Sequence, residues 1–505
     1  FNLGISLSAS GHPIEAIEAY KKVLRLKPDL KEAFFCLGNT YWQIGRDEEA
    51  AEAFENALKL DADYTDAAVN LAEIKNDESA LQLLAQKNPQ DARSFYYLGR
   101  RRFAEQKYSE ALPDLQKADG LLVSAEIKTL LAETFLALQQ HDKALPLFYA
   151  ALRLEPHNSA AALHIADLEA EKANYAEAEK YYKKAGELNP DSVQMHANYA
   201  NMLCRLKRTL EALEEYRAAV RLEPEQPELS YNLAIILKTL EEYEQALALM
   251  FNAFYLAPHH VDWSLNIAET ITLFYAKSHE KALKIAENWY EKMPENTVAK
   301  HLWAVLNGKS SDNETEYNRL LFDCFAENYE NVLQNISYNV VEKMAEIIPP
   351  LKGKVLDLGC GTGLIGEKFK NTDNVFYGID LSAAMLKLAE SKKVYQNLEH
   401  TDALVYLERH KNEFSAIISA DVFCYFGELR PLLDAASPVR IIFSVETDSL
   451  AETYKIQPNG RYKHNPQYVE KLLKEAGYKA VKSYPLILRK ENNEDVNGII
   501  FDAYV

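Results

Sequence analysis

Residues 354–363 of this chain read KVLDLGCGTG, and this stretch decides the fold of the C-terminal half. The apolar run at its start predicts a buried strand, and the glycines at 359, 361 and 363 predict a turn whose backbone approaches a ligand closely. Residues 363–370 predict a helix, and the first turn of a helix offers free N–H donors. We therefore expect a strand, a ligand-binding turn and a helix in that order.

Two kinds of cofactor bind at a turn of this type. Gly361, Gly363 and Gly366 satisfy the dinucleotide pattern GxGxxG, and Asp380 follows 19 residues after the first of them. Asp357 changes this interpretation, because a carboxylate beside the turn repels a diphosphate and attracts the sulfonium and ammonium groups of S-adenosylmethionine. A purely structural role is the alternative for Asp357, as a cap that accepts hydrogen bonds from the backbone of the turn. The charge argument favours S-adenosylmethionine.

The rest of the C-terminal half alternates between strand and helix patterns. Apolar β-type runs occupy 354–358, 375–379, 414–419 and 440–445, and helical patterns occupy 363–370, 382–391, 403–410 and 466–476. Such alternation with short connections predicts a parallel sheet that is covered on both faces. Residues 480–489 and 497–505 read as two further strands without a helix between them. We expect a Rossmann-like α/β domain with a mostly parallel, seven-stranded sheet.

Acidic residues follow the strands at the edge where open α/β sheets bind their ligands. Asp380 ends the second strand, where it would accept the ribose hydroxyls or cap the helix that begins at Ser382. Asp402 follows the third strand, where it would meet the adenine amino group or cap the next helix. Asp421 closes the fourth strand at the same crevice. Their order along the chain predicts a nucleoside-binding edge.

Small and large side chains recur every 34 residues in the first 309 residues. Ala16 and Ala50 are one period apart, and Ala178, Ala212 and Ala246 form a second run. Small residues let two helices approach closely, the large residue four positions later fills the space between units, and a proline ends the second helix. This pattern resembles the tetratricopeptide repeat (TPR), a helix–turn–helix unit.

The TPR resemblance implies an all-α superhelical solenoid over residues 1–309. We count about nine units, the first of them truncated, and expect a capping helix at 296–309. The polar stretch 307–315 ends the repeats, so a second domain is expected at 310–505. The concave face of such an array is expected to bind a protein or peptide. A scaffold that merely positions the second domain is the alternative.

From about residue 317 to its end, the chain resembles the bacterial class I methyltransferases that carry an N-terminal TPR array. The matching segments are FDCFAENYENVLQNISY (322–338), VLDLGCGTGLIGE (355–367), GIDLSAAMLKLAE (378–390), DVFCYFGEL (421–429), FSVE (443–446), GRYKHNPQYV (460–469) and LRKENNEDVNG (488–498). The resemblance implies an S-adenosylmethionine-dependent methyltransferase but does not imply an acceptor. The expected cofactor-binding residues are Asp357, Gly359, Cys360, Gly361, Gly363, Asp380, Leu381, Met385, Asp402, Ala403 and Asp421.

Methyl transfer needs the acceptor to be aligned with the sulfonium, and a base is needed only where the acceptor carries a proton. The expected catalytic candidates are His464, Glu446, Asp421 and Tyr425. Of these, His464 or Glu446 is expected to be the base, although Glu446 could instead pair with Arg461. Residues 317–346 are expected to fold over the cofactor as a pair of lid helices, with Phe325 and Tyr329 as contacts or as ordinary core residues.

Composition and charge narrow the remaining function classes. The formal net charge is −19, and both halves carry an excess of acid, so nucleic-acid binding is not expected. No stretch approaches the length of a membrane span. The five cysteines lack CxxC spacing, which suits reduced thiols in a cytoplasmic protein and predicts no metal site. Because the chain opens in mid-repeat at Phe1, we interpret it as a fragment.

The leading hypothesis is a methyltransferase whose repeats recruit or present a protein or peptide acceptor. One alternative is a methyltransferase for a small molecule or saccharide, with the repeats used for assembly. A second is a TPR scaffold whose cofactor domain senses rather than catalyses, and an NAD-dependent oxidoreductase is the outsider.

Overall fold

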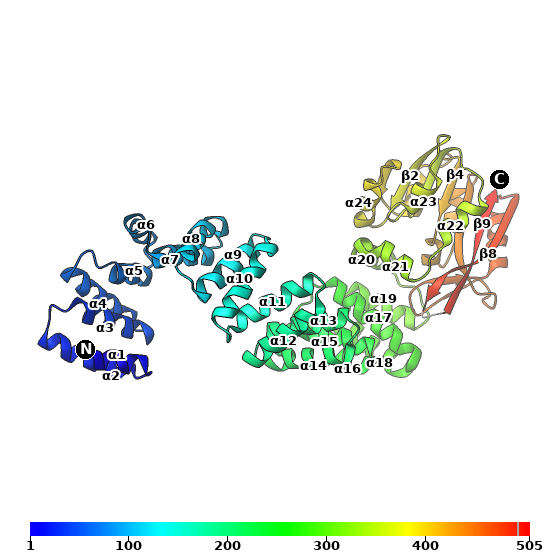
Figure 1. Ribbon diagram of the computed structural model, residues 1–505. Helices are drawn as coiled ribbons and strands as arrows, with labels where there is room; N and C mark the ends of the chain where they lie inside the picture. Colours follow the sequence, from blue (N-terminus) through cyan, green and yellow to red (C-terminus); the bar gives the residue numbers. More distant parts are fainter. Residues whose placement is uncertain (492–493) are drawn as a thin grey trace. The chain divides into compact units, whose positions relative to one another are not determined.

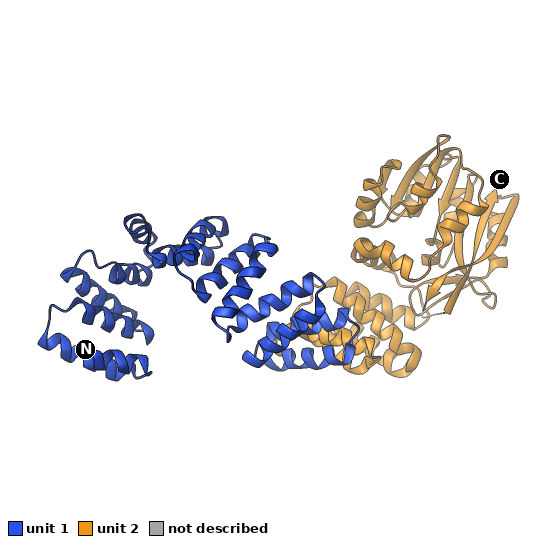
Figure 2. Ribbon diagram, in the orientation of Figure 1, with its two compact units in different colours: residues 1–223 blue, residues 224–505 orange. Residues whose placement is uncertain are grey.

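The structure is a computed structural model that describes residues 1–491 and 494–505, so Asn492 and Asn493 of the last matched segment lie outside the described residues. The chain divides into two compact units, Phe1–Glu223 and Pro224–Val505 (Figure 2). The second unit holds the last helical repeats together with the sheet. The expected boundary at 309/310 therefore falls inside a compact unit.

The first unit consists of helices that pack as successive antiparallel pairs (Figure 1). Its helices are α1 (Asn2–Ala9), α2 (Pro13–Leu26), α3 (Lys31–Gln43), α4 (Asp47–Leu60), α5 (Thr65–Ile74), α6 (Glu78–Lys87), α7 (Ala92–Ala104), α8 (Tyr108–Leu121), α9 (Ala125–Ala137), α10 (His141–Leu154), α11 (Ser159–Glu171), α12 (Tyr175–Leu188), α13 (Val193–Arg205) and α14 (Thr209–Leu222). The helices α5 and α6 have 10 residues each, which matches the shortened repeat that the sequence shows near residues 72–89.

The recurring small and large residues meet inside each helix pair. A Cβ atom built on Gly38 of α3 would lie 2.6 Å from the ring of Phe54 in α4, and one on Gly4 would lie 2.7 Å from Tyr20. The ring of Phe54 is fully buried. The large residue therefore fills the space within a unit, whereas we had expected it between units, because the missing side chain at the glycine makes room for it there.

The helical part of the second unit continues the same pairing. It contains α15 (Pro227–Thr239), α16 (Tyr243–Leu256), α17 (Val261–Lys277), α18 (His279–Lys292) and the single helix α19 (Thr297–Leu306). Proline stands two residues after the end of α16, at Pro258, where the chain leaves the helix. The predicted all-helical TPR solenoid is confirmed.

Three helical segments connect the repeats to the sheet. They are α20 (Glu314–Phe325), α21 (Tyr329–Asn335) and α22 (Val340–Ile347). In α20, Tyr317 and Leu321 pack into the hydrophobic core formed by α16 to α19, and the Tyr317 ring stacks on His301 with the ring centroids 3.8 Å apart. This helix therefore belongs to the core of the last repeats as well as to the domain that follows.

The sheet has five parallel strands in the order β3-β2-β1-β4-β5, and β5 is followed by antiparallel β9 and then β8 (Figure 1). The strands are β1 (Gly353–Leu358), β2 (Asn374–Asp380), β3 (Tyr395–His400), β4 (Ala416–Ser419), β5 (Arg440–Thr447), β6 (Tyr454–Ile456), β7 (Tyr462–His464), β8 (Ala480–Glu491) and β9 (Glu494–Tyr504). The helices between them are α23 (Leu364–Phe369), α24 (Ala383–Ser391), α25 (Ala403–Arg409), α26 (Arg430–Ala436) and α27 (Pro466–Glu475). The predicted Rossmann-like class with a mostly parallel sheet is confirmed.

Two short strands join the seven that the sequence predicts. The hairpin of β6 and β7 pairs with the end of β5 at Glu446 and Thr447, beyond the last residue of β5 that pairs with β4. The sequence predicts no strand in this region, because strands of three residues are too short to give an alternating pattern. The hairpin positions Arg461 and His464.

Both faces of the sheet are buried, as a parallel sheet requires. Leu356 and Leu358 of β1 contribute to a core that includes residues of α25, α26 and α27. Val355 contributes to the opposite core, which includes residues of α22 and α23. Among the described residues, no helix combines the length and apolar composition that a bilayer crossing requires.

We predict that Gly38→Ala lowers the melting temperature of the full chain, since its methyl group must displace the buried ring of Phe54. The expected destabilisation is about 1–3 kcal/mol, typical of overpacking. Gly120→Ala in α8 is the matched control, because nothing lies within 4 Å of its Cβ position. There the loss of glycine entropy should stabilise the helix by about 0.5–1 kcal/mol. Equal melting shifts for the two variants in circular dichroism would contradict the packing described.

Candidate active site

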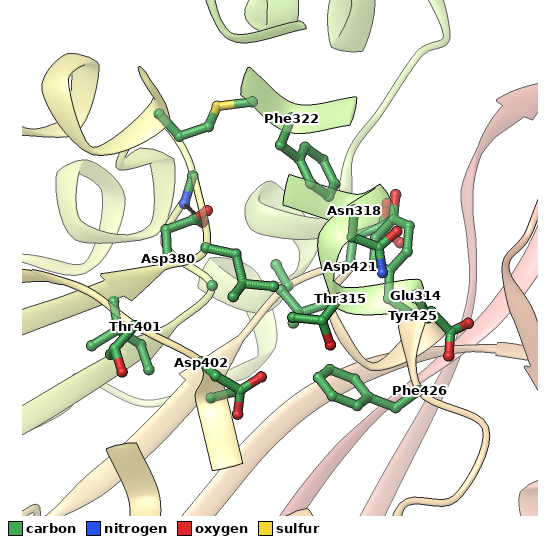
Figure 3. A pocket seen from close by; sticks show the side chains of 18 of the residues that line it. Glu314, Thr315, Asn318, Phe322, Asp380, Thr401, Asp402, Asp421, Tyr425 and Phe426 are labelled. Carbon is green, nitrogen blue, oxygen red and sulfur yellow. Dashed lines mark hydrogen bonds between the residues drawn. The ribbon is translucent and has the colours of Figure 1, made fainter. Parts of the chain in front are cut away.

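A cavity of about 860 Å³, open to solvent on one side, lies at the carboxyl ends of β1, β2, β3 and β4. Figure 3 shows Asp380, Thr401 and Asp402 on one side of it and Asn318, Asp421, Tyr425 and Phe426 on the other. The lining of the cavity consists of Glu314, Thr315, Asn318, Phe322, Tyr329, Gly359, Gly361, Ile379, Asp380, Leu381, Met385, Thr401, Asp402, Ala403, Ala420, Asp421, Val422, Tyr425 and Phe426.

The turn after β1 forms one wall of the cavity with backbone alone. Gly359 and Gly361 have φ of 72° and 53°, a conformation that glycine adopts without strain. A Cβ on Gly359 would lie 2.4 Å from Val422. A Cβ on Gly361 would have only the Tyr329 ring near it, at 3.9 Å, and would take space from the cavity. The backbone is thus free to approach a ligand.

Asp357, Cys360 and Gly363 do not line this cavity. Asp357 is fully buried beneath the turn, where the Tyr395 hydroxyl donates to its Oδ2 at 2.6 Å. Its Oδ1 has no partner among the described residues, and burial raises the pKa of Asp357 to about 7. The Gly366 N–H of the following helix also lowers the pKa of Asp357, so the backbone contributes beside the tyrosine. A positive charge above the turn would stabilise this carboxylate.

Asp380 and Asp402 hold the backbone at the edge of the cavity. The two oxygens of Asp380 accept hydrogen bonds from the backbone N–H groups of Gly361 and Ser382, each at 2.8 Å. Ser382 itself caps α24, so the expected cap role of Asp380 is wrong. Asp402 caps α25 through Oδ1, and its Oδ2 accepts no bond from the described residues. Both carboxylates remain available to a ligand, since each oxygen accepts more than one hydrogen bond.

Asp421 lies at the centre of a buried ion-pair network. Arg461 contacts its Oδ2 at 2.8 Å and Arg489 contacts its Oδ1 at 3.3 Å. Burial opposes ionisation, yet these two guanidinium groups hold the pKa of Asp421 below its usual value. Glu446 pairs with both arginines, at 2.5 Å from Arg461 and 2.6 Å from Arg489. Arg489 also pairs with Glu491 at 2.6 Å, so two arginines and three carboxylates form the network behind the cavity.

Arg461 occupies the centre of the one group of potential metal ligands found in the described part of the chain. Asp421, Cys424 and Glu446 have ligand atoms within 4.8 Å of one another. The guanidinium of Arg461 contacts all three, with Cys424 Sγ at 2.9 Å. A cation is already provided there by the protein itself.

The structure separates the four expected catalytic residues. Asp421 and Tyr425 line the cavity, whereas Glu446 and His464 do not. His464 is fully buried, its Nε2 donates to the Gly427 carbonyl at 3.2 Å, and burial lowers its pKa. Neither Glu446 nor His464 has a described path to a substrate in this cavity.

Helix α20 supplies a wall of the cavity, and its residues from 317 onward fall within the lid expected at 317–346, whereas Glu314 and Thr315 at its start were not expected there. Glu314, Asn318 and Phe322 are spaced by four residues and share one face of the helix, with Thr315 beside them. Phe322 takes the place expected for Phe325, which is 41% exposed at the helix end, whereas Tyr329 lines the cavity as expected. The i, i+4, i+8 spacing was present in the sequence, but a stripe of Glu, Asn and Phe is not an apolar face.

Comparisons with known proteins divide the chain in the same way. Residues 355–439 match the family model described as "Methyltransferase domain". Residues 14–45 match "TPR repeat", and residues 31–64, 135–203 and 200–260 match "Tetratricopeptide repeat" models.

Three curated relatives were found at moderate identity. "Putative methyltransferase YqeM" of Bacillus subtilis is 30% identical over 21% of this chain, and "Protein O-mannosyl-transferase TMTC1" of Homo sapiens is 25% identical over 42%. "DnaJ homolog subfamily C member 3" of Gallus gallus is 27% identical over 35%. The chain spans only 42%, 25% and 33% of the lengths of these relatives.

Solved structures with some similarity include that of Pseudomonas aeruginosa PilF, at 22% identity and a TM-score of 0.36 over 38% of this chain and 92% of that chain. The structure of YrrB, titled as a TPR protein with an unusual peptide-binding site, has 18% identity and a TM-score of 0.26 over 41% of this chain and 94% of that chain.

The raised pKa of Asp357 predicts how stability depends on pH. A carboxyl whose folded-state pKa is about 7 favours folding below its unfolded value of 3.8, and this contribution is lost as the pH rises to about 7. Asp357→Asn, which cannot ionise, should therefore gain stability over the wild type as the pH rises, by roughly 4 kcal/mol above pH 7. Chemical denaturation without ligand at several pH values measures the difference. Parallel pH curves would contradict the buried, unpaired carboxyl.

Proposed function

We propose that this chain, which combines tetratricopeptide repeats with a methyltransferase domain, transfers the methyl group of S-adenosylmethionine to a protein or peptide acceptor held by the repeats. The proposal has two parts, the methyl donor and the acceptor. They rest on different observations and are tested separately.

The charge of the cavity supports the methyl donor. Four carboxylates line the cavity, and none of its lining residues is a lysine, arginine or histidine. Arg461 and Arg489 offset Asp421 from behind the cavity. The diphosphate of a dinucleotide would still meet Asp380 and Asp402 with no cation among the lining residues, whereas the sulfonium and ammonium of S-adenosylmethionine are attracted. This acidic lining beside a glycine turn is the observation that carries the proposal.

The residues of the cavity suit the parts of such a donor. The backbone of Gly359 and Gly361 would receive the amino-acid end, with Asp357 beneath the turn favouring its positive charge. Asp380 would accept hydrogen bonds from the ribose hydroxyls, and Oδ2 of Asp402 would accept one from the adenine amino group. Leu381, Met385 and Ala403 would contribute apolar contacts to the adenine.

S-adenosylmethionine, when bound, supplies a methyl group that is already activated for displacement. The contribution of the protein is to orient the acceptor and to exclude water. Phe322, Tyr329 and Tyr425 form an aromatic cluster at the end of β4, with Phe322 to Tyr425 centroids 5.3 Å apart. Asp421 and Tyr425 are proposed to orient the acceptor, while Glu446 and His464 act as positioning residues behind them.

The dual packing of α20 supports an acceptor that the repeats present. One face of this helix lies in the core of the last repeats, and the other lines the cavity. TPR arrays generally bind proteins or peptides on their concave face. We therefore propose that residues 1–309 select the acceptor and residues 310–505 modify it, with α20 shared between the two functions.

Asp380→Asn should weaken S-adenosylmethionine binding by about 10- to 100-fold, because a charge-assisted hydrogen bond to the ribose is lost. Calorimetry on the full chain measures the affinity. Asp373→Asn is the control, since Asp373 is exposed just before β2 and pairs only with Lys352. Tighter binding of NAD than of S-adenosylmethionine would refute the proposed donor.

The acceptor is tested with radiolabelled S-adenosylmethionine and a cell lysate. The full chain should label a discrete protein band, and residues 224–505 should bind the donor but label that band poorly. Residues 310–505 are expected to fold badly, since Tyr317 and Leu321 lose the core they pack against. Label confined to small molecules, or undiminished labelling by residues 224–505, would favour a small-molecule or saccharide acceptor. Donor binding without any transfer would favour a sensing scaffold.

A further inference from the structure

Three of the four carboxylates in the cavity have partners that occupy them. Asp380 accepts two backbone N–H groups, Asp402 caps α25, and Asp421 is paired with two arginines. Glu314 differs, because no salt bridge joins it to a cation among the described residues. Its Oε1 is buried without a hydrogen-bond partner. Glu314 and the Oδ2 of Asp402 therefore have capacity left, and of the two Glu314 lies in the half of the cavity lined by Tyr425 and Phe426 (Figure 3).

The position of Glu314 is fixed by the repeats. It opens α20, on the same face as Asn318 and Phe322. The preceding residue, Asn313, donates from Nδ2 to the Thr297 carbonyl of α19 at 2.9 Å, and Tyr317 stacks on His301. The Tyr462 hydroxyl lies beside the carboxylate and bonds to Ser310 at 2.6 Å. The start of α20 is thus anchored on both sides of Glu314, which is suited to hold a substrate in one geometry.

Aromatic rings complete the surroundings of this carboxylate. Phe426, Tyr425 and Phe322 line the same half of the cavity (Figure 3). Ring faces and carboxylates together favour a cation, and they disfavour an anion such as a carboxylate or phosphate acceptor. Burial raises the pKa of Glu314 to about 7, so the group can both accept and release a proton near neutrality.

We propose that Glu314 is the catalytic base of the methyl transfer, and that the acceptor is an amine whose ammonium form binds between Glu314 and the aromatic rings. The inference rests on the proposed function and specifies its acceptor chemistry. Glu314 takes the place that sequence analysis gives to His464 or Glu446, neither of which lines the cavity.

The proton and electron balance is straightforward. The ammonium group gives one proton to the Glu314 carboxylate and becomes a neutral amine. The nitrogen lone pair then forms a bond to the methyl carbon while the carbon–sulfur bond breaks, and its electron pair stays on sulfur, which becomes a neutral thioether. The product is a methylated ammonium ion, and Glu314 returns its proton to water. No oxidant or further co-reactant is needed.

A binding experiment tests the amine site without turnover. The full chain, saturated with S-adenosylhomocysteine, is titrated with n-butylammonium and with butyrate at about pH 8, where the carboxyl is ionised. We expect n-butylammonium to bind and butyrate not to bind, with Glu314→Gln weakening the amine by more than about tenfold. Glu316→Gln is the matched control, because Glu316 pairs with Arg319 on the same helix outside the cavity. Absent amine binding, equal butyrate binding or an unaffected Glu314→Gln variant would each overturn the amine site.

A melting experiment tests the poised carboxyl in the free protein. Because its folded-state pKa of about 7 exceeds the ordinary 4.5, the wild type should lose melting temperature relative to Glu314→Gln as the pH rises between these values. Glu316→Gln should follow the wild type. Parallel curves for the wild type and Glu314→Gln would overturn the assignment of Glu314 as the base.

Transfer to lysate protein separates this inference from the proposed function. Glu314→Gln should slow labelling by at least about a hundredfold, as the loss of a general base does, and should lose the pH dependence near neutrality. The label should survive mild alkali as an N-methyl group. Labelling at the wild-type rate, or alkali-labile methyl esters, would overturn the inference while leaving methyl transfer intact. A wild-type chain that labels nothing would count against the proposed function, and the binding and melting results would still decide the role of Glu314.

Discussion

The side of the cavity lined by Asp421 and Tyr425 depends on the pairing of Arg461 and Arg489 with Asp421 and Glu446. Arg489 is 2% exposed and Glu446 is equally buried, so neither charge would be tolerated alone. Removing one partner of a buried pair typically costs about 3–5 kcal/mol, because the other charge is left uncompensated. This network holds Asp421 at the end of β4 with φ of 60°, an unusual conformation for a residue other than glycine. The segment that follows, with Tyr425 and Phe426, is therefore kept in place by electrostatics rather than by packing alone.

Arg461 connects this network to the repeats. Arg461 ends a turn in which the Gln457 N–H donates to the Arg461 carbonyl at 2.8 Å. The Thr272 hydroxyl of α17 donates to the Pro458 carbonyl in this turn at 3.4 Å. Gly460, with φ of 83°, lies against the His301 ring, where a Cβ atom would approach Nε2 to 2.8 Å. The arginine that neutralises Asp421 thus sits on a turn supported by helices of the repeat array.

Much of the fold could be predicted from the sequence, because both halves follow strong periodic patterns. The spacing of Ala16 and Ala50 identifies the helix pairs, and the alternation after Lys354 identifies the parallel sheet. The strands β6 and β7 could not be found, since three residues give no alternation and they form only by pairing with β5. Their formation depends on contacts between distant parts of the chain, which a local pattern does not contain.

The part of the cavity formed by Gly359, Gly361, Asp380 and Asp402 was also accessible to sequence reasoning, since these residues follow the strands directly. The part formed by the start of α20 was not. Glu314 precedes Asp357 by 43 residues in the sequence. The face of α20 that carries it shows polar residues with no apolar periodicity, so the sequence pattern does not link it to the cavity. His464 and Glu446, the bases expected from the sequence, do not line the cavity. A hydrogen bond to the Gly427 carbonyl holds His464 in the interior, and ion pairs with arginines hold Glu446 there. Which titratable groups remain unpaired is a property of the folded protein.

The shared helix α20 also bears on how such proteins can be recombined. Repeat arrays are commonly regarded as modular, and exchanging one for another is an obvious route to a new specificity. Here the hydrophobic core of the last repeats continues through Tyr317 and Leu321 of α20, the helix that also lines the cavity. A chimera joined directly before Ser310 would replace the helices of the last repeats that Tyr317 and Leu321 pack against. One joined near Glu223 would keep those helices together with α20. Genetic exchange within this architecture is therefore expected to spare the final two repeats and the helix that caps them.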